Sequence, residues 1–189
     1  EEHGCRPTLT TYGVDEASHH GIERVVDHEQ TTSLGDEILG VGARITLFNG
    51  CGGEYAAALS QIDRRTANAI VLTHDAVERE SPLAVTLMQA MTRGDKMDWV
   101  LQKATELGVA AVQPIEAARS VVQLDAVRAE KRRLHWLGIL RSACEQCGRN
   151  RPPRLLAPAS LEEACRTFAQ TSPDALLLTL EPSASMGLE

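Results

Sequence analysis

Short apolar runs alternate with turn residues over residues 41–75. The runs span residues 43–48, 54–59 and 69–73, and Asn49-Gly50-Cys51-Gly52-Gly53 lies between the first two. Asn-Gly and Gly-Gly supply positions that accept a positive φ, as a hairpin or a bulged turn requires. The pattern predicts a small antiparallel β-barrel. Residues 1–40 show no pattern from which we predict an element.

The pattern changes after a charged, proline-bearing stretch at residues 78–82, which has the composition of a linker. Beyond it, apolar runs of strand length alternate with segments of helical periodicity. We predict strands at residues 83–88, 109–114, 154–157 and 175–180, and helices at residues 96–107, at 125–147 and from 161. Strands that alternate with helices predict a mostly parallel sheet covered on both faces.

Residues that start and stop helices mark the boundaries of these segments. Asp95 is the expected N-cap of the first helix, whose buried face would consist of Met97, Val100, Leu101, Ala104 and Leu107. Gly108 and Gly148 would end the first two helices. Ser160 and Glu163 have the spacing of a capping box and predict the start of the third helix.

An apolar fraction of 43% is sufficient for a folded core, but no apolar run approaches the roughly 20 residues that span a bilayer. The amino terminus, Glu1-Glu2-His3, lacks the basic start and apolar centre of a signal peptide. The five cysteines are odd in number and irregularly spaced, which favours reduced thiols. We therefore expect a cytoplasmic protein without a membrane partner.

Charge is unevenly distributed along the chain. The net charge is −7, yet residues 119–154 hold nine Lys or Arg and three Asp or Glu. A local basic patch matters more to a polyanion than the net charge does, so this window is compatible with an RNA partner. A solvated helix face is the alternative, and charge alone does not separate the two.

Several familiar sites are disfavoured by the spacing of their residues. Cys144 and Cys147 lack the second pair of ligands that a structural zinc site needs, and they fall at the end of a predicted helix. Small buried side chains are the simpler interpretation. Adjacent His19 and His20 point in different directions on a helix or a strand. We therefore predict no metal site.

Polar side chains gather where the long predicted helix ends. Glu145, Gln146, Arg149 and Asn150 are followed by Arg151-Pro152-Pro153-Arg154. The planar fork of arginine suits phosphate, and the amide of Gln or Asn can pair with a uracil edge. A capped helix end with solvated charges is the alternative.

Two segments carry a family resemblance: Arg93-Gly94-Asp95-Lys96-Met97-Asp98 running into Gln102-Lys103-Ala104-Thr105-Glu106-Leu107-Gly108-Val109, and Ala143-Cys144-Glu145-Gln146-Cys147-Gly148-Arg149-Asn150-Arg151. Together they resemble the ribosomal RNA small subunit methyltransferase E family of knotted SPOUT enzymes. The resemblance implies an α/β fold with two domains. Residues 1–80 would form a PUA-like antiparallel β-barrel that helps to bind RNA, and residues 83–189 a SPOUT-type (trefoil-knot) methyltransferase domain.

By this resemblance the chain would transfer a methyl group from S-adenosylmethionine to N3 of a uridine in 16S ribosomal RNA, within the assembled small subunit, and would form a homodimer. The implied catalytic residues are Arg149, Gln146 and Glu145. Contacts to RNA are expected from Arg93, Lys96, Arg119, Asn150 and Arg151. Cofactor contacts are expected from Leu180, Glu181 and Pro182.

The chain stops at Glu189, before the Gly-Pro-Glu-Gly-Gly loop and the Leu-Arg-Thr-Glu-Thr segment with which the family holds its cofactor. The resemblance therefore predicts a methyltransferase domain that is incomplete at its carboxyl end. The alternative is an RNA-binding or ribosome-assembly protein of the same descent that does not catalyse methyl transfer.

Overall fold

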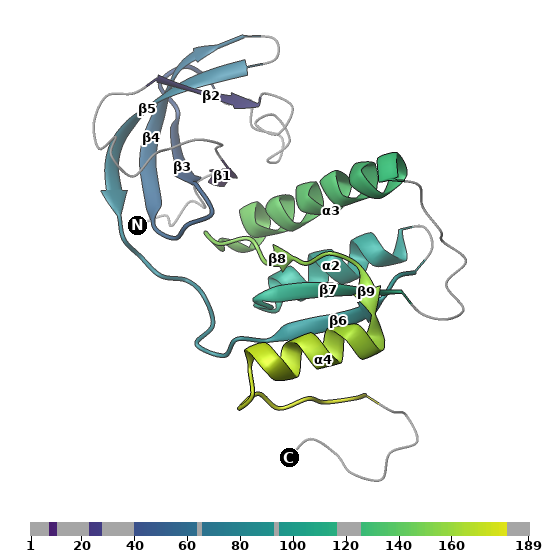
Figure 1. The fold of residues 1–189 in the computed structure, drawn as a ribbon. Helices are drawn as coiled ribbons and strands as arrows, with labels where there is room; N and C mark the ends of the chain where they lie inside the picture. Colours follow the sequence, from purple (N-terminus) through teal and green to yellow (C-terminus); the bar gives the residue numbers. More distant parts are fainter. Residues whose placement is uncertain are drawn as a thin grey trace.

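The computed structural model describes residues 40–63, 67–92, 95–116 and 127–180 with their side chains. It also describes the backbone of residues 66 and 126 and of strands β1 (Thr8–Thr10) and β2 (Glu23–Asp27). Two sheets, one from each half of the chain, are joined by the linker at residues 76–85, which contains no helix or strand (Figure 1). This division agrees with the change of pattern in the sequence.

The first sheet is built around β3 (Arg44–Phe48), β4 (Glu54–Ile62) and β5 (Thr66–Asp75). Its strand order is β1-β3-β4-β5-β2, and every pairing is antiparallel except that of β1 with β3. Alternate side chains of β3, β4 and β5 form one core: Ile45, Leu47, Tyr55, Ala57, Leu59, Ala67, Ala69 and Val71. The predicted antiparallel strands are confirmed, with β4 and β5 longer than expected, while closure into a barrel stays a prediction.

The glycine-rich turn connects β3 to β4 in the manner that the sequence predicts. Gly50, Gly52 and Gly53 all have positive φ, at 83°, 92° and 72°. Asn49 Oδ1 accepts a hydrogen bond of 2.9 Å from the Cys51 amide, which closes the start of the turn. A Cβ at position 52 would overlap the Arg151 guanidinium, so this turn also contacts the second half of the chain.

The second sheet consists of β6 (Thr86–Ala90), β7 (Ala111–Glu116), β8 (Arg154–Leu155) and β9 (Ala159–Ser160). All its pairings are parallel, with β7 between β6 on one side and β8 and β9 on the other. Helices α2 (Lys96–Glu106) and α3 (Ala126–Cys147) cover one face, and α4 (Leu161–Thr171) covers the other (Figure 1). The predicted parallel sheet with helices on both faces is confirmed.

The segment that pairs with β7 is interrupted between β8 and β9, opposite Pro114. Val112 pairs with Leu155 and Ile115 pairs with Ala159, so two residues of β7 face three residues of the neighbouring segment. Pro114, one of the two, has no amide hydrogen to give to a ladder. The side-chain amide of Gln113 donates to the Ala157 carbonyl at 2.6 Å and takes the place of the absent ladder bond.

The buried row of α2 differs from the predicted one. Met97, Leu101 and Thr105 are buried, whereas Leu107 is 87% exposed and lies just beyond the helix. Thr105 can be buried because its hydroxyl donates to the Leu101 carbonyl at 2.8 Å. Asp95 is at the N-cap position, but its side chain makes no capping hydrogen bond.

The remaining helix boundaries follow the sequence. Gly108 and Gly148 end α2 and α3 with φ of 87° and 76°, and Ser160 Oγ accepts the Glu163 amide at 3.2 Å in the predicted N-cap of α4. Among the helices of the described residues, none is long and apolar enough to cross a membrane.

Two predicted strands are wrong in part or in whole. The strand expected at residues 83–88 begins three residues later, and Leu83 before it is 69% exposed. The apolar run at residues 175–180 forms no strand, and its leucines are more than half exposed. An apolar run becomes a strand only when a neighbour supplies hydrogen bonds, and in the described part of the chain none pairs with this segment.

Candidate functional site

The carboxyl end of α3 turns back into the protein. Gly148 adopts a left-handed conformation after Cys147, and its amide closes onto the Cys144 carbonyl at 2.9 Å. The next two side chains are buried although both are polar: Arg149 is 7% exposed and Asn150 is 1% exposed. Burial of a polar side chain costs free energy unless hydrogen-bond partners compensate it.

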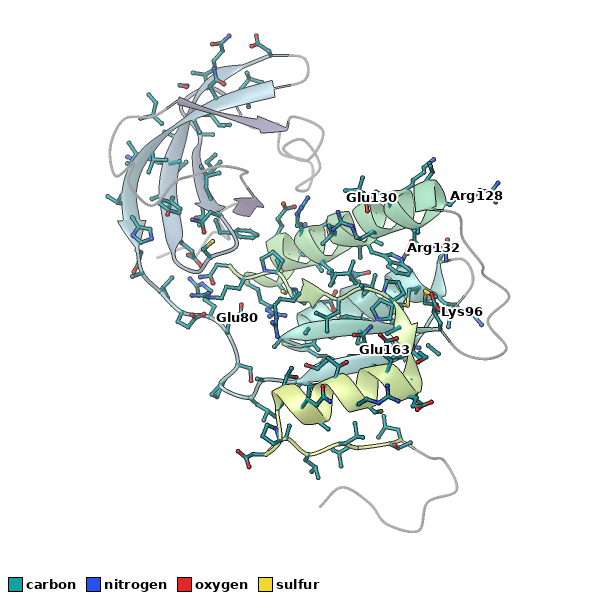
Figure 2. The ribbon with its side chains drawn as sticks, in the orientation of Figure 1. Glu80, Lys96, Arg128, Glu130, Arg132 and Glu163 are labelled. Atoms are coloured by element: carbon teal, nitrogen blue, oxygen red, sulfur yellow. The ribbon has the colours of Figure 1, made fainter. Side chains whose placement is uncertain are left out.

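Arg149 joins three separate segments of the chain. Its Nη1 donates to the carbonyl oxygens of Thr105 and Val109 at 2.9 and 3.0 Å, at the end of α2 and before β7. Its Nε and Nη2 donate to the carboxylate of Glu80, which lies on the linker (Figure 2). These contacts use four of the five N–H groups that a guanidinium carries. The side chain therefore fixes the linker against the second sheet.

Asn150 and Arg151 hold the neighbouring linker residues. The Asn150 amide donates to the Val77 carbonyl at 3.0 Å, while its Oδ1, also buried, has no hydrogen-bond partner among the described residues. Arg151 forms an ion pair of 3.2 Å with Glu78. Hydrogen bonds from the Glu80 and Arg79 amides, together with Arg151, hold the pKa of the Glu78 carboxyl below its usual value.

Arg79 completes the joint on the opposite side of the linker. Its guanidinium forms an ion pair with Glu54, the first residue of β4, and this carboxylate raises the pKa of Arg79. Residues 77–80 are thus held by the first sheet through Arg79 and by the end of α3 through the other three. We call this set of contacts the linker joint.

Glu145 and Gln146 lie one turn before the joint and differ in exposure. Ala143 and Cys144 face the core, Glu145 is half-buried, and Gln146 is exposed. Burial raises the pKa of the Cys144 thiol to about 12, which agrees with the interpretation of this cysteine as a small buried side chain. Cys147 is exposed, so the same interpretation is wrong for it.

The other predicted site residues are scattered or lie outside the described residues. Lys96 is exposed at the start of α2, at the far end of α2 from the joint (Figure 2). Leu180 is 85% exposed. Four predicted residues lie outside the described residues: Arg93, Arg119, Glu181 and Pro182. The structure therefore brings together Glu145, Gln146, Arg149, Asn150 and Arg151, and no described contact adds Lys96 or Leu180 to them.

The acidic partners of the joint were not predicted from the sequence. Glu78 and Glu80 precede Arg149 by about 70 positions, and no local pattern connects them with it. The signal that could have indicated them is the charged stretch before Pro82, which stands out among the apolar runs on either side.

Of the three predicted cofactor contacts, the described residues include Leu180 and leave out Glu181 and Pro182. An adenosine and a methionine chain need apolar walls and fixed hydrogen-bond partners on more than one side. Leu180, the described residue predicted to contact the cofactor, is exposed in a segment without helix or strand. Leu180 by itself therefore does not form a wall of a cofactor site.

Comparison with known proteins gives a consistent group of relatives. Residues 79–188 match the model of a family described as an RNA methyltransferase domain. Ribosomal RNA small subunit methyltransferase E of Bacillus subtilis is 32% identical over 146 residues, which cover 77% of this chain and 56% of that protein. The protein of the same name from Buchnera aphidicola (Schizaphis graminum) is 28% identical, and the match again covers 56% of that protein. The chain thus spans a little over half the length of these relatives.

Solved structures share the fold. A protein from Legionella pneumophila described as a methyltransferase, solved with the cofactor SAM bound, matches with a TM-score of 0.83 and 31% identity, over 97% of this chain and 73% of that one. Ribosomal RNA small subunit methyltransferase E from Neisseria gonorrhoeae, bound to S-adenosyl methionine, matches with a TM-score of 0.72 and 38% identity, over 83% of this chain and 64% of that one.

Proposed function

Because the chain belongs to the RNA methyltransferase family, we propose that it acts in the S-adenosylmethionine-dependent methylation of small-subunit ribosomal RNA. The observation that carries the proposal is the agreement of fold, over 97% of the chain, with a methyltransferase that was solved with its cofactor bound.

The finer assignment that we propose is N3 of a uridine in 16S ribosomal RNA, within the assembled subunit. N3 of uridine carries a proton, so methylation requires that this proton leave while the nitrogen takes the methyl group from the sulfonium of the donor. The proposal includes a PUA-like RNA-binding domain at residues 1–80, a SPOUT-type methyltransferase domain from residue 83, a homodimer and a cytoplasmic location.

Within the predicted site, we assign two kinds of role. Gln146 is exposed and Glu145 half-buried on the last turn of α3, so both can meet a base, and the amide of Gln146 can pair with a uracil edge. Arg149 is committed to Glu80 and to two carbonyls, which supports a positioning role: it would set the angle at which α3 meets the linker. Asn150 and Arg151 would act with it.

The experiment is transfer of tritiated methyl groups from S-adenosylmethionine to purified small ribosomal subunits that lack the modification. We expect label in 16S ribosomal RNA and a stop in primer extension at one uridine, because a methyl group on N3 blocks base pairing. Calorimetric titration of S-adenosylmethionine and of its demethylated product measures cofactor binding separately. No label, with the protein shown to be folded and the cofactor bound, would contradict the proposal.

A matched pair of variants tests the role of Gln146. Gln146→Ala should reduce methyl transfer at unchanged cofactor binding, whereas Gln170→Ala, an exposed glutamine on α4, should leave both unchanged. Equal activity of the two variants would remove Gln146 from the site. Binding of RNA without binding of cofactor would favour the alternative of a non-catalytic RNA-binding protein.

A further inference from the structure

The three ion pairs of the linker joint differ in how far solvent reaches them. They are Arg149 with Glu80, Arg79 with Glu54, and Arg151 with Glu78. The side chains of the first pair are 8% and 19% exposed, and those of the second are 49% and 17% exposed. In the third pair the values are 47% and 54%. Of the three, the third is therefore the pair whose two charged groups are both accessible to an anion from outside.

The pair of Arg151 with Glu78 also has the fewest hydrogen bonds. Arg149 and Arg79 each hold their carboxylate through two nitrogens. Arg151 donates to Glu78 through Nε alone, at 3.2 Å, and its two Nη groups have no hydrogen-bond partner among the described residues. A guanidinium binds phosphate through two parallel N–H groups, so Arg151 has donors available for such a contact.

The glycine-rich turn between β3 and β4 leaves room for this guanidinium. A Cβ on Gly52 would overlap Arg151 Nη2 and would lie 2.7 Å from its Cζ and Nε. Gly52 has a φ of 92°, which glycine adopts without strain. The guanidinium therefore lies against the backbone of the turn, at the point where the first sheet meets the end of α3.

Glu78 keeps hydrogen bonds when Arg151 is taken away from it. Its Oε1 accepts the backbone amides of Arg79 and Glu80 at 3.0 and 3.1 Å, whereas Arg151 is bound to Oε2. An exposed ion pair of this kind contributes little to the free energy of unfolding. Breaking it leaves neither a buried charge nor a carboxylate without hydrogen bonds, so the pair can open at low cost.

We propose that Glu78 competes with RNA for Arg151: its carboxylate occupies the guanidinium in the free protein, and a phosphate of the bound RNA takes its place. This rests on the proposed function and deepens it, because it adds a regulation of RNA binding at the linker joint. The carboxylate mimics the phosphate, so RNA that lacks other contacts with the protein does not displace it. The acidic linker thereby selects against weakly held RNA.

The test is a double-mutant cycle on the binding of a fluorescein-labelled oligouridine RNA of about 20 nucleotides, at about 50–300 mM KCl. Arg151→Gln should weaken binding and reduce the slope of log affinity against log salt by about 0.7, the contribution of one phosphate contact in a single strand. Glu78→Gln removes the competing charge at nearly constant size, and it should strengthen binding by up to about fivefold at low salt.

The decisive variant combines the two substitutions. In the Arg151→Gln background, Glu78→Gln should strengthen binding no more than the control does. Glu130→Gln is that control, because it removes the same charge from an exposed pair with Arg133 on α3. Inorganic phosphate, added at constant ionic strength, should leave the RNA bound. Circular dichroism checks that each variant keeps the wild-type fold.

Four outcomes overturn the competition. They are no RNA binding by the wild type, a gain from Glu78→Gln no larger than that from Glu130→Gln, a gain that persists in full without Arg151, and displacement of the RNA by inorganic phosphate. Methyl transfer by the wild type to small ribosomal subunits would leave the proposed function standing in each case. Absence of methyl transfer with the cofactor bound would contradict the proposed function, whatever the affinities for RNA are.

Discussion

The two ends of α3 use the same kind of residue in opposite ways. At the carboxyl end, the cations of Arg149 and Arg151 are paired with carboxylates of the linker. In the amino-terminal half, Lys131 faces solvent without such a partner among the described residues. The number of basic residues in the sequence is similar at both ends, so the number alone does not distinguish a cation that is paired within the protein from one that faces solvent.

The ion pair at the carboxyl end of α3 fixes the position of the linker more than it adds to the net stability of the fold. Removing two charges from water costs about as much as their attraction returns, so a buried pair such as Arg149 and Glu80 is weak evidence for stability. The pair does define one arrangement, because any other position of the linker leaves a guanidinium or two carbonyls unpaired. The pairs in the amino-terminal half, Arg133 with Glu130 and His135 with Asp98, are more exposed.

The largest expected effect of a substitution is at the buried end. Arg149→Met should lower the free energy of unfolding by about 3–5 kcal/mol, because it leaves the Glu80 carboxylate partly buried without a partner. Urea unfolding measures the change. Arg133→Met, which breaks an exposed pair on the same helix, is the control and should cost less than about 1 kcal/mol.

A double variant that removes both charges of the pair tests the cause of this loss of stability. Arg149→Met/Glu80→Leu should recover most of the lost stability, because an apolar pair of similar volume replaces the ion pair. If the double variant is as unstable as Arg149→Met alone, the carbonyls of Thr105 and Val109 dominate the role of Arg149.

Asn150 should show a smaller effect at the same end. Asn150→Ala removes the donor to the Val77 carbonyl and should cost about 1–2 kcal/mol in the free energy of unfolding. Asn150→Asp should cost more, since it places a charge at a site that is 1% exposed. Thermal unfolding of the two variants compares them, and an aspartate variant as stable as wild type would contradict the burial.

Substitution of Gly138 should change the free energy of unfolding in the opposite direction. Gly138→Ala should raise the free energy of unfolding by about 0.5–1 kcal/mol, because alanine is the better helix former and its Cβ has open space. Gly148→Ala, at a φ of 76°, should instead lower it by about 1 kcal/mol. If the urea unfolding midpoints of both variants shifted in the same direction, this distinction between the two glycines would be contradicted.

Lys131 should have the smallest effect on stability. Lys131→Gln removes an exposed charge without a partner among the described residues, so the free energy of unfolding should change by less than about 0.5 kcal/mol. A larger loss in urea unfolding would show that Lys131 has a structural role, and the comparison between the two ends of α3 would fail.

Local patterns were sufficient to predict most elements. The alternation of β3 and β4, the glycines after α2 and α3, and the capping box of α4 each depend on residues within a few positions of one another. The family resemblance, which rested on two local motifs, is likewise confirmed.

Features that depend on distant partners were not predictable. The burial of Arg149 depends on Glu80, 69 positions away, and the run at residues 175–180 has the composition of a strand but needs a neighbour to become one. The sequence indicated the cluster from Glu145 to Arg151, but it could not indicate which side chains face inward. The predicted catalytic roles stay predictions until methyl transfer is measured.

The interruption opposite Pro114 has a consequence for folding. With two residues of β7 facing three residues of the next segment, β8 and β9 can both pair only in one alignment. A slip by one position would turn every side chain to the wrong face and would leave one of the two short strands without its partner. Misaligned intermediates are therefore poorly stabilised, and α4, which follows β9 directly, should dock only after the correct alignment has formed.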